Sequence, residues 1–163
     1  MKTAIVYYSM SGNTAQTAEK IAAGIGADLI RIDPVKEYPS KGFRKFFWGG
    51  KSAVMGETPA LQPYRFDGSY DRIIFGSPVW ASTFAPPIRT FIDDNRQLLD
   101  GKSIAAFFCS SGGGTEKAYA KLRQCLEVDV LEAQLDLIDP IAKPSPENEQ
   151  KIKTFCDRLK ARS

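Results

Sequence analysis

Hydrophobic and polar positions along the chain follow two periods, one typical of strands and one typical of helices. Apolar, β-branched and aromatic residues gather in five short runs, which we predict to be strands at 3–8, 27–33, 71–76, 103–109 and 131–137. Between and after them, apolar residues recur at the three- and four-residue spacing of amphipathic helices, within 15–25, 86–92, 115–126 and 146–159. This alternation predicts an α/β fold with an open parallel sheet and helices on both faces.

The runs differ in how completely they are apolar, and this difference indicates their places in the sheet. The run 104–109 is apolar throughout, as expected of a strand that helices cover on both faces. The run 131–137 alternates apolar with polar residues, and 27–33 carries several charges, so we predict both at sheet edges. Proline at 86–87 and Ser-Pro at 145–146 mark the starts of two helices.

The size and composition of the chain are ordinary for a soluble globular protein. We expect one domain over 1–163, because this length is enough to bury a core. The longest apolar run is too short to cross a bilayer, and the first strand follows Met1-Lys2 directly, which leaves no room for a signal peptide. Three cysteines without C-x-x-C spacing and the absence of histidine predict free thiols, no metal site and a cytoplasmic location.

The stretch between the first strand and the first helix is rich in small hydroxyl residues. It consists of Ser9, Met10, Ser11, Gly12, Asn13 and Thr14. A loop at this place directs backbone N–H groups and the positive end of a helix dipole toward one spot, which favours an anion. Because the loop contains no lysine, it is not the nucleotide-triphosphate loop, and its neutral donors suit a single phosphate monoester. The alternative interpretation is a helix cap made by Ser11 or Asn13.

Two more loops of this kind follow the third and fourth predicted strands. The loop 77–87 carries Trp80 and three prolines, and we interpret the tryptophan as a platform for a flat aromatic ligand. The alternative is that Trp80 packs on the helix that begins at Pro86. The loop 110–114, Ser-Ser-Gly-Gly-Gly, suits a close approach of backbone to ligand or a flexible turn. If the first, third and fourth strands are neighbours, all three loops share one rim of the sheet, where such folds bind ligands.

In these loops the chain resembles the flavodoxin-like family, and the resemblance covers essentially its whole length. Residues 9–14 are similar to the family's [ST]-x-[ST]-G-x-T phosphate loop, while 76–80 and 110–114 are similar to its two ring-flanking loops. The resemblance implies a doubly wound, five-stranded parallel sheet in the order 2-1-3-4-5 with helices on both faces. It also implies FMN as the cofactor, bound where the strand order reverses.

The resemblance further implies a set of cofactor-binding residues and the part of FMN that each loop binds. The first loop would hold the FMN phosphate, and the other two would flank the flavin ring, with Trp80 against it. The full set is Ser9, Met10, Ser11, Gly12, Asn13, Thr14, Pro78, Val79, Trp80, Ala81, Ser82, Phe84, Ser110, Ser111, Gly112, Gly113 and Gly114. Because no histidine exists and no carboxylate falls in these loops, we assign no catalytic residue and no metal ligand.

The sequence departs from the family pattern in ways that bear on function. Family electron carriers are typically acidic, whereas this chain has 22 basic and 19 acidic residues, so the usual partners are not expected. Glycines at 112–114 replace a ring-flanking tyrosine often found there, which leaves one ring face open to a substrate. The loop 78–87 contains no glycine, so Ala81 or Ser82 would oppose any turn that requires positive φ.

The segment 41–51 is the least regular part of the sequence, with four aromatic and four basic residues in eleven positions. We consider three interpretations: a lid over the flavin edge, a docking site for an acidic partner, or a cover for the sheet beside the second strand.

The function predicted is that of an FMN-binding redox protein in electron transfer. The alternative is an NAD(P)H-dependent FMN reductase of quinones or similar small acceptors, so whether the protein is an FMN-dependent oxidoreductase enzyme stays open. A non-redox alternative, a phosphoanion-binding signalling domain, requires acidic residues where Tyr7-Tyr8-Ser9 and Gly76-Ser77 stand. We expect a redox partner protein or a small electron acceptor, neither nucleic acid nor membrane as partner, and a monomer or weak dimer.

Overall fold

The computed structural model describes residues 1–39, 51 and 55–162. Five parallel strands form a sheet in the order β2-β1-β3-β5-β6, which is the predicted order 2-1-3-4-5. These strands are β1 (Thr3–Tyr7), β2 (Asp28–Arg31), β3 (Arg72–Trp80), β5 (Ser103–Ser110) and β6 (Gln134–Ile138). A sixth strand, β4 (Thr83–Phe84), pairs antiparallel with β3 and was not predicted. The edge positions predicted for 27–33 and 131–137 are confirmed, since β2 and β6 end the order.

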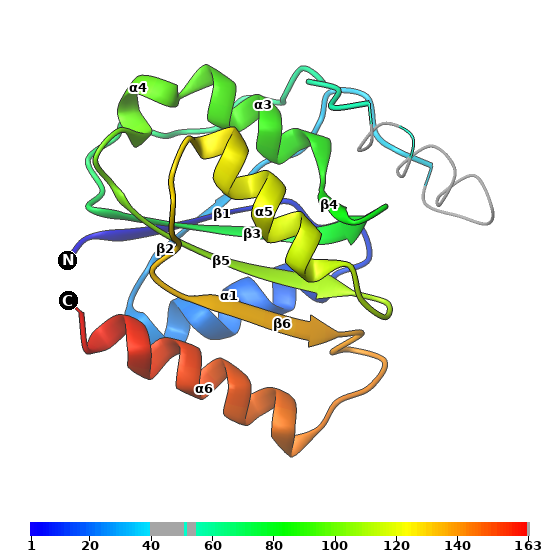
Figure 1. The fold of residues 1–163 in the computed structure, drawn as a ribbon, viewed down its shortest axis with the longest axis vertical. Helices are drawn as coiled ribbons and strands as arrows, with labels where there is room; N and C mark the ends of the chain where they lie inside the picture. Colours follow the sequence, from blue (N-terminus) through cyan, green and yellow to red (C-terminus); the bar gives the residue numbers. More distant parts are fainter. Residues whose placement is uncertain (40–50, 52–54, 163) are drawn as a thin grey trace.

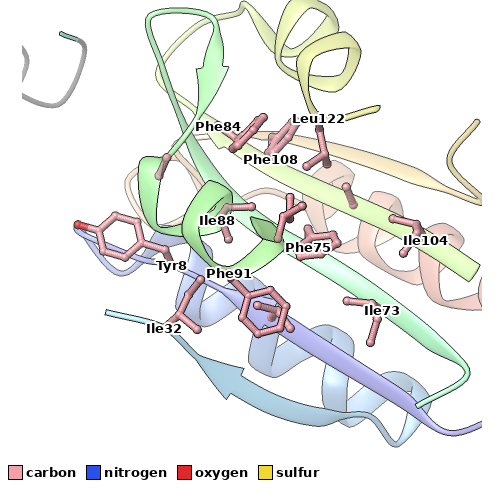
Figure 2. Close-up of a cluster of buried hydrophobic side chains, with 14 of the residues drawn as sticks. Tyr8, Ile32, Ile73, Phe75, Phe84, Ile88, Phe91, Ile104, Phe108 and Leu122 are labelled. Atoms are coloured by element: carbon pink, nitrogen blue, oxygen red, sulfur yellow. The ribbon is translucent and has the colours of Figure 1, made fainter. Parts of the chain in front are cut away.

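Helices cover both faces of the sheet, as Figure 1 shows. Helices α1 (Asn13–Ile25) and α6 (Pro146–Lys160) lie on one face, and α3 (Pro86–Asp94), α4 (Arg96–Leu99) and α5 (Thr115–Leu126) lie on the other. Alternate residues of each buried strand point to opposite faces, so the core divides into two clusters. In β3, Phe75 packs with Ile88 and Phe91 of α3 (Figure 2), whereas Ile74 belongs to the cluster that includes Ile21 and Phe155.

The segment predicted as a loop at 77–87 is instead mostly a β-hairpin. Strand β3 continues to Trp80, turns at Ala81 and Ser82, and returns as β4, with Trp80 opposite Thr83. Both turn residues have positive φ, 49° and 59°, which is the signature of a type I′ two-residue turn. The Ser77 hydroxyl fixes the base of the hairpin, since it accepts a hydrogen bond from the Ala85 N–H at 2.8 Å.

The starts of the first and last helices differ in how they are capped. The Ser145 hydroxyl accepts a hydrogen bond from the Asn148 N–H at 3.1 Å, so the predicted cap of α6 is confirmed. Helix α1 follows Gly12, whose φ of 96° is left-handed and which has no side chain to cap the helix. The interpretation of Ser11 or Asn13 as its N-cap is therefore wrong, and the first turn keeps donors for other partners.

A buried ion pair lies at the amino ends of the strands. The Arg72 guanidinium donates two hydrogen bonds to the Glu132 carboxylate, from Nε at 2.7 Å and from Nη2 at 2.6 Å. Arg72 also donates to the Leu159 carbonyl at 2.9 Å, and the Ser103 hydroxyl donates to Glu132. The pair joins the starts of β3 and β5 to the end of α6. It therefore lies at the amino ends of the strands, whereas the predicted binding loops follow their carboxyl ends.

Three predictions concern features that the described residues test only in part. The aromatic and basic segment 41–51 lies outside the described residues apart from Lys51, and its interpretation stays a prediction. Within the described part of the chain, no helix is long and apolar enough to cross a membrane, and no group of three acidic, cysteine or histidine side chains could hold a metal ion. All three cysteines are free thiols.

Candidate functional site

A cavity of about 530 Å³ opens at the carboxyl ends of β1, β3 and β5. The strand registers place Tyr7 opposite Gly76 and Pro78 opposite Cys109, so the loops after these strands share one edge. The residues that line the cavity are Met10, Ser11, Asn13, Thr14, Pro78, Val79, Trp80, Ala81, Ser82, Cys109, Ser110, Ser111, Gly112, Gly113, Gly114 and Asp139. The structure thus brings together the three segments that the sequence singled out, around a volume typical of small-molecule sites.

The first loop forms a cradle of backbone donors at the start of α1. The buried Ser9 hydroxyl shapes it from behind, accepting hydrogen bonds from the N–H groups of Gly12 at 3.2 Å and Ala15 at 3.1 Å. Within the described part of the chain, no acceptor is hydrogen-bonded to the backbone N–H groups of Asn13 and Thr14. These two donors stand at the positive end of the helix dipole, so the cradle suits an anion although it contains no cation.

The floor of the cavity beside this cradle is formed by Thr14 and Cys109. The Cys109 thiol is buried and lies 3.6 Å from the Thr17 hydroxyl. Burial raises the pKa of Cys109 to about 11, an effect that hydrogen bonds with Thr17 and Thr14 only partly offset. The thiol is therefore protonated at neutral pH and does not act as a nucleophile.

The second wall is the hairpin, whose Trp80 ring is held by two tyrosines. Trp80 meets Tyr8 edge to face, with ring centroids 5.6 Å apart, and Tyr38 in the same way at 5.2 Å. Such pairs are favourable beyond the area they bury, and they fix the orientation of the indole. Trp80 is half-buried and also lines the cavity, so it serves as a wall, while its packing partners are Tyr8 and Tyr38.

The third wall, 110–114, touches the hairpin at one point. A Cβ on Gly114 would lie 2.8 Å from the Ser82 hydroxyl oxygen and 3.2 Å from the Ser82 Cα, and Gly114 has a φ of 81°. Both the contact and the conformation require glycine at this position. Gly112 and Gly113, by contrast, have open space where side chains would be. The wall therefore packs closely against the hairpin at Gly114, and it leaves unoccupied space beside Gly112 and Gly113.

Most of the predicted site residues line the cavity, and three do not. Ser9 and Gly12 shape the cradle without facing the cavity. Phe84 belongs to the core, where it is 2% exposed and packs beneath the Arg89 guanidinium, so its assignment to the site is corrected. The reason is the hairpin, because β4 places Phe84 in the core cluster that also contains Ile88 and Phe91 of α3.

Two residues that line the cavity were missed from the sequence. Cys109 stands at the end of the fourth predicted strand, and Asp139 follows the fifth. The rule that ligands bind beyond the carboxyl ends of parallel strands would have indicated Asp139, had it been applied to every strand. Among the described residues that line the cavity, Asp139 is the only charged one.

Comparisons with known proteins agree with this arrangement. Residues 2–137 match the family model described as Flavodoxin. A flavoprotein from Lactobacillus acidophilus, solved in complex with FMN, is 24% identical with a TM-score of 0.72, over 86% of this chain and 96% of that one. The apo form of a flavoprotein from the same organism is 28% identical with a TM-score of 0.64, over 87% and 95% of the two chains. Oxidised flavodoxin 1 from Bacillus cereus is 20% identical with a TM-score of 0.56, over 100% and 99%.

Proposed function

Since this chain belongs to the flavodoxin family, we propose that it binds FMN in the cavity and works as a redox protein in electron transfer. The observation that carries the proposal is the cradle at residues 9–14, which offers free backbone donors without a cation and opens directly into the cavity. One cradle of this kind suits the single phosphate of FMN better than the pyrophosphate of FAD.

The residues present fit FMN in each part of the cavity. The N–H groups of Asn13 and Thr14, with the Ser11 and Thr14 hydroxyls, would hold the phosphate. The fixed Trp80 ring and the backbone of 110–114 would flank the flavin ring. When bound, FMN supplies the redox chemistry, and the protein supplies binding, orientation and a partly dry environment.

The surroundings of the cavity bear on the electron partner. Apart from Asp139, the described lining residues are uncharged, and the whole chain has a net charge of +3. This favours a partner other than the basic proteins that strongly acidic carriers attract. We propose a redox protein or a small electron acceptor as the partner, and a monomer or weak dimer as the working form. The free thiols suit a reducing compartment, and we propose the cytoplasm.

Cofactor identification tests the proposal directly. Protein reconstituted with a mixture of FMN and FAD is expected to retain FMN, to show the visible absorption of a flavoprotein, and to release FMN on heating, as chromatography would identify. Recovery of FAD alone, or of no flavin, would contradict the proposal. Anaerobic reduction of the loaded protein, followed by mixing with candidate acceptors, then tests whether the bound flavin passes electrons on.

A reductase of small acceptors is a second candidate, favoured by the open wall at Gly112 and Gly113. Steady-state oxidation of NADH and NADPH in the presence of a benzoquinone distinguishes the two. Turnover well above that of free FMN supports the reductase, and its absence supports the carrier. A signalling domain is not proposed, because the one carboxylate among the described lining residues follows β6, while β1 and β3 end without acidic residues.

A further inference from the structure

The loop at residues 9–14 is also contacted from outside the cavity, by Arg31 at the end of β2. The Arg31 guanidinium donates a hydrogen bond from Nη2 to the Ser9 backbone carbonyl at 3.1 Å. The strand register brings it there, because Arg31 pairs with Tyr7 and the Ile32 N–H donates to the Tyr7 carbonyl at 2.9 Å. Arg31 does not line the cavity, so it holds the loop from the opposite side.

Asp33 fixes the orientation of the Arg31 guanidinium. The Arg31 Nε donates to both oxygens of the Asp33 carboxylate, at 2.9 and 3.2 Å. One planar group therefore joins a carboxylate to a backbone carbonyl, which suits the fixed fork of arginine. The Arg31 side chain is 48% exposed, and an ion pair this exposed adds little to the stability of a fold. We therefore expect its main effect to fall on the loop.

The hydrogen bond at Ser9 determines the direction of the next backbone donor. The Ser9 carbonyl and the Met10 N–H belong to one peptide unit, and the described chain contains no cis peptide bond, so the two groups point in opposite directions. The strand order β2-β1-β3 places Arg31 on one side of β1 and the cavity on the other. Within the described residues, no acceptor is hydrogen-bonded to the Met10 N–H, and Met10 lines the cavity. Its N–H is thus a free donor directed to the cavity side.

Ser9 is consequently held at both of its polar groups, at the hydroxyl by the N–H groups of Gly12 and Ala15 and at the carbonyl by Arg31. We propose that Arg31 is a positioning residue for the anion, which holds the Ser9 carbonyl and so directs the Met10 N–H at the phosphate of FMN. The inference rests on the proposed function, because it places that phosphate in the cradle. A donor that is oriented before the ligand arrives costs no ordering on binding, and this raises the affinity.

Three ligands test the role of Arg31, each measured on apoprotein through the quenching of flavin fluorescence. They are FMN, inorganic phosphate as a competitor of FMN, and riboflavin, which is FMN without its phosphate. Arg31→Met removes the guanidinium and keeps a long side chain. We expect it to weaken the binding of FMN and of inorganic phosphate by about three- to tenfold each. Riboflavin affinity is expected to stay the same, which a general disturbance of the cavity would not allow.

Asp33→Ala separates positioning from simple attraction between charges. Removal of the carboxylate frees the guanidinium to move and makes the surroundings of the loop more positive. If Arg31 positions the loop, FMN binding weakens by about two- to fivefold. If Arg31 acts only by its charge, FMN binding becomes tighter, because a negative charge near the phosphate has been removed.

The control is Arg96→Met, at an arginine with the same arrangement away from the cavity. Arg96 donates to the Asp93 carboxylate at 2.8 Å and to the Cys125 carbonyl at 3.1 Å, and its side chain is 43% exposed. Its loss is expected to leave all three affinities unchanged.

The proposal is overturned if Arg31→Met binds FMN as tightly as the parent, if riboflavin loses as much affinity as FMN, or if Asp33→Ala binds FMN as tightly as the parent or more tightly. Failure of the proposed function looks different, because the parent itself would then not bind FMN.

Discussion

Thr14 and Thr17 lie on the same face of α1, yet only Thr14 lines the cavity. Both are buried, and the hydroxyls of both affect the Cys109 thiol. Thr17 has a second task, since its hydroxyl donates to the Asn13 carbonyl at 2.9 Å. The two residues therefore share their type, burial and neighbour, and they differ in access to the ligand. This makes them a matched pair for testing the cradle.

We predict that Thr14→Val weakens FMN binding by about 1.5–3 kcal/mol, the usual contribution of a hydrogen bond to a charged group. Valine keeps the shape of the side chain and removes only the hydroxyl. Thr17→Val is the control, and its FMN affinity is expected to equal that of the parent. Fluorescence titration of the three apoproteins with FMN measures the difference. Equal affinities for Thr14→Val and the parent would assign the Thr14 hydroxyl to Cys109 alone.

At the scale of the element, the hairpin stores backbone strain that its sequence could have avoided. Type I′ turns favour glycine or asparagine, but here Ala81 and Ser82 both adopt positive φ. Each left-handed residue with a side chain costs about 1–2 kcal/mol. Three contacts hold the turn in place: the pairing of β3 with β4, the bond from the Ala85 N–H to Ser77, and the contact between Ser82 and Gly114.

We therefore predict that Ala81→Gly stabilises the apoprotein by about 0.5–1 kcal/mol, because relief of strain exceeds the extra flexibility of glycine in the unfolded chain. Urea denaturation measures the change. The control is Ala161→Gly, at an exposed residue with a φ of −64°, where the same substitution is expected to be neutral or destabilising. A loss of stability in Ala81→Gly as large as that in the control would mean that the turn is not strained.

The hairpin also shows where the sequence was insufficient. The five parallel strands could be predicted, since apolar runs long enough to cross a sheet alternate with helical patterns, whereas their order was implied by the resemblance to the flavodoxin-like family. Strand β4 has only two residues, and its turn lacks the glycine that marks a type I′ hairpin, so 77–87 looked like a loop. Asp139 differs, because the rule that ligands bind beyond the carboxyl ends of parallel strands covers it, and only its exact position depends on where β6 stops and on the docking of Ile141 against Asn13.

At the scale of the whole molecule, the two ends of the sheet serve different purposes. The carboxyl ends carry strained turns and free donors around the cavity, whereas the amino ends carry the fully bonded pair of Arg72 and Glu132. Their side chains are 2% and 7% exposed. Removing one partner leaves an uncompensated buried charge, which typically costs about 3–5 kcal/mol. We expect this pair to stabilise the folded apoprotein, since it lies at the amino ends of the strands, away from the cavity at their carboxyl ends.

The pH dependence of stability offers the test. Burial alone would raise the pKa of Glu132, but hydrogen bonds from Arg72 and Ser103 outweigh it and hold the pKa below the ordinary value of 4.5. A depressed pKa means that the stabilisation is complete above about pH 4.5 and is lost as the pH falls through the lower, folded-state value.

Glu132→Gln should therefore be less stable by about 3–5 kcal/mol at pH 7. Its disadvantage should shrink below pH 4.5, as urea denaturation at a series of pH values would show. Glu147→Gln, at an exposed pair with Lys151, should change stability by at most about 1 kcal/mol. A gap between parent and Glu132→Gln that stays constant down to pH 3 would contradict the assignment.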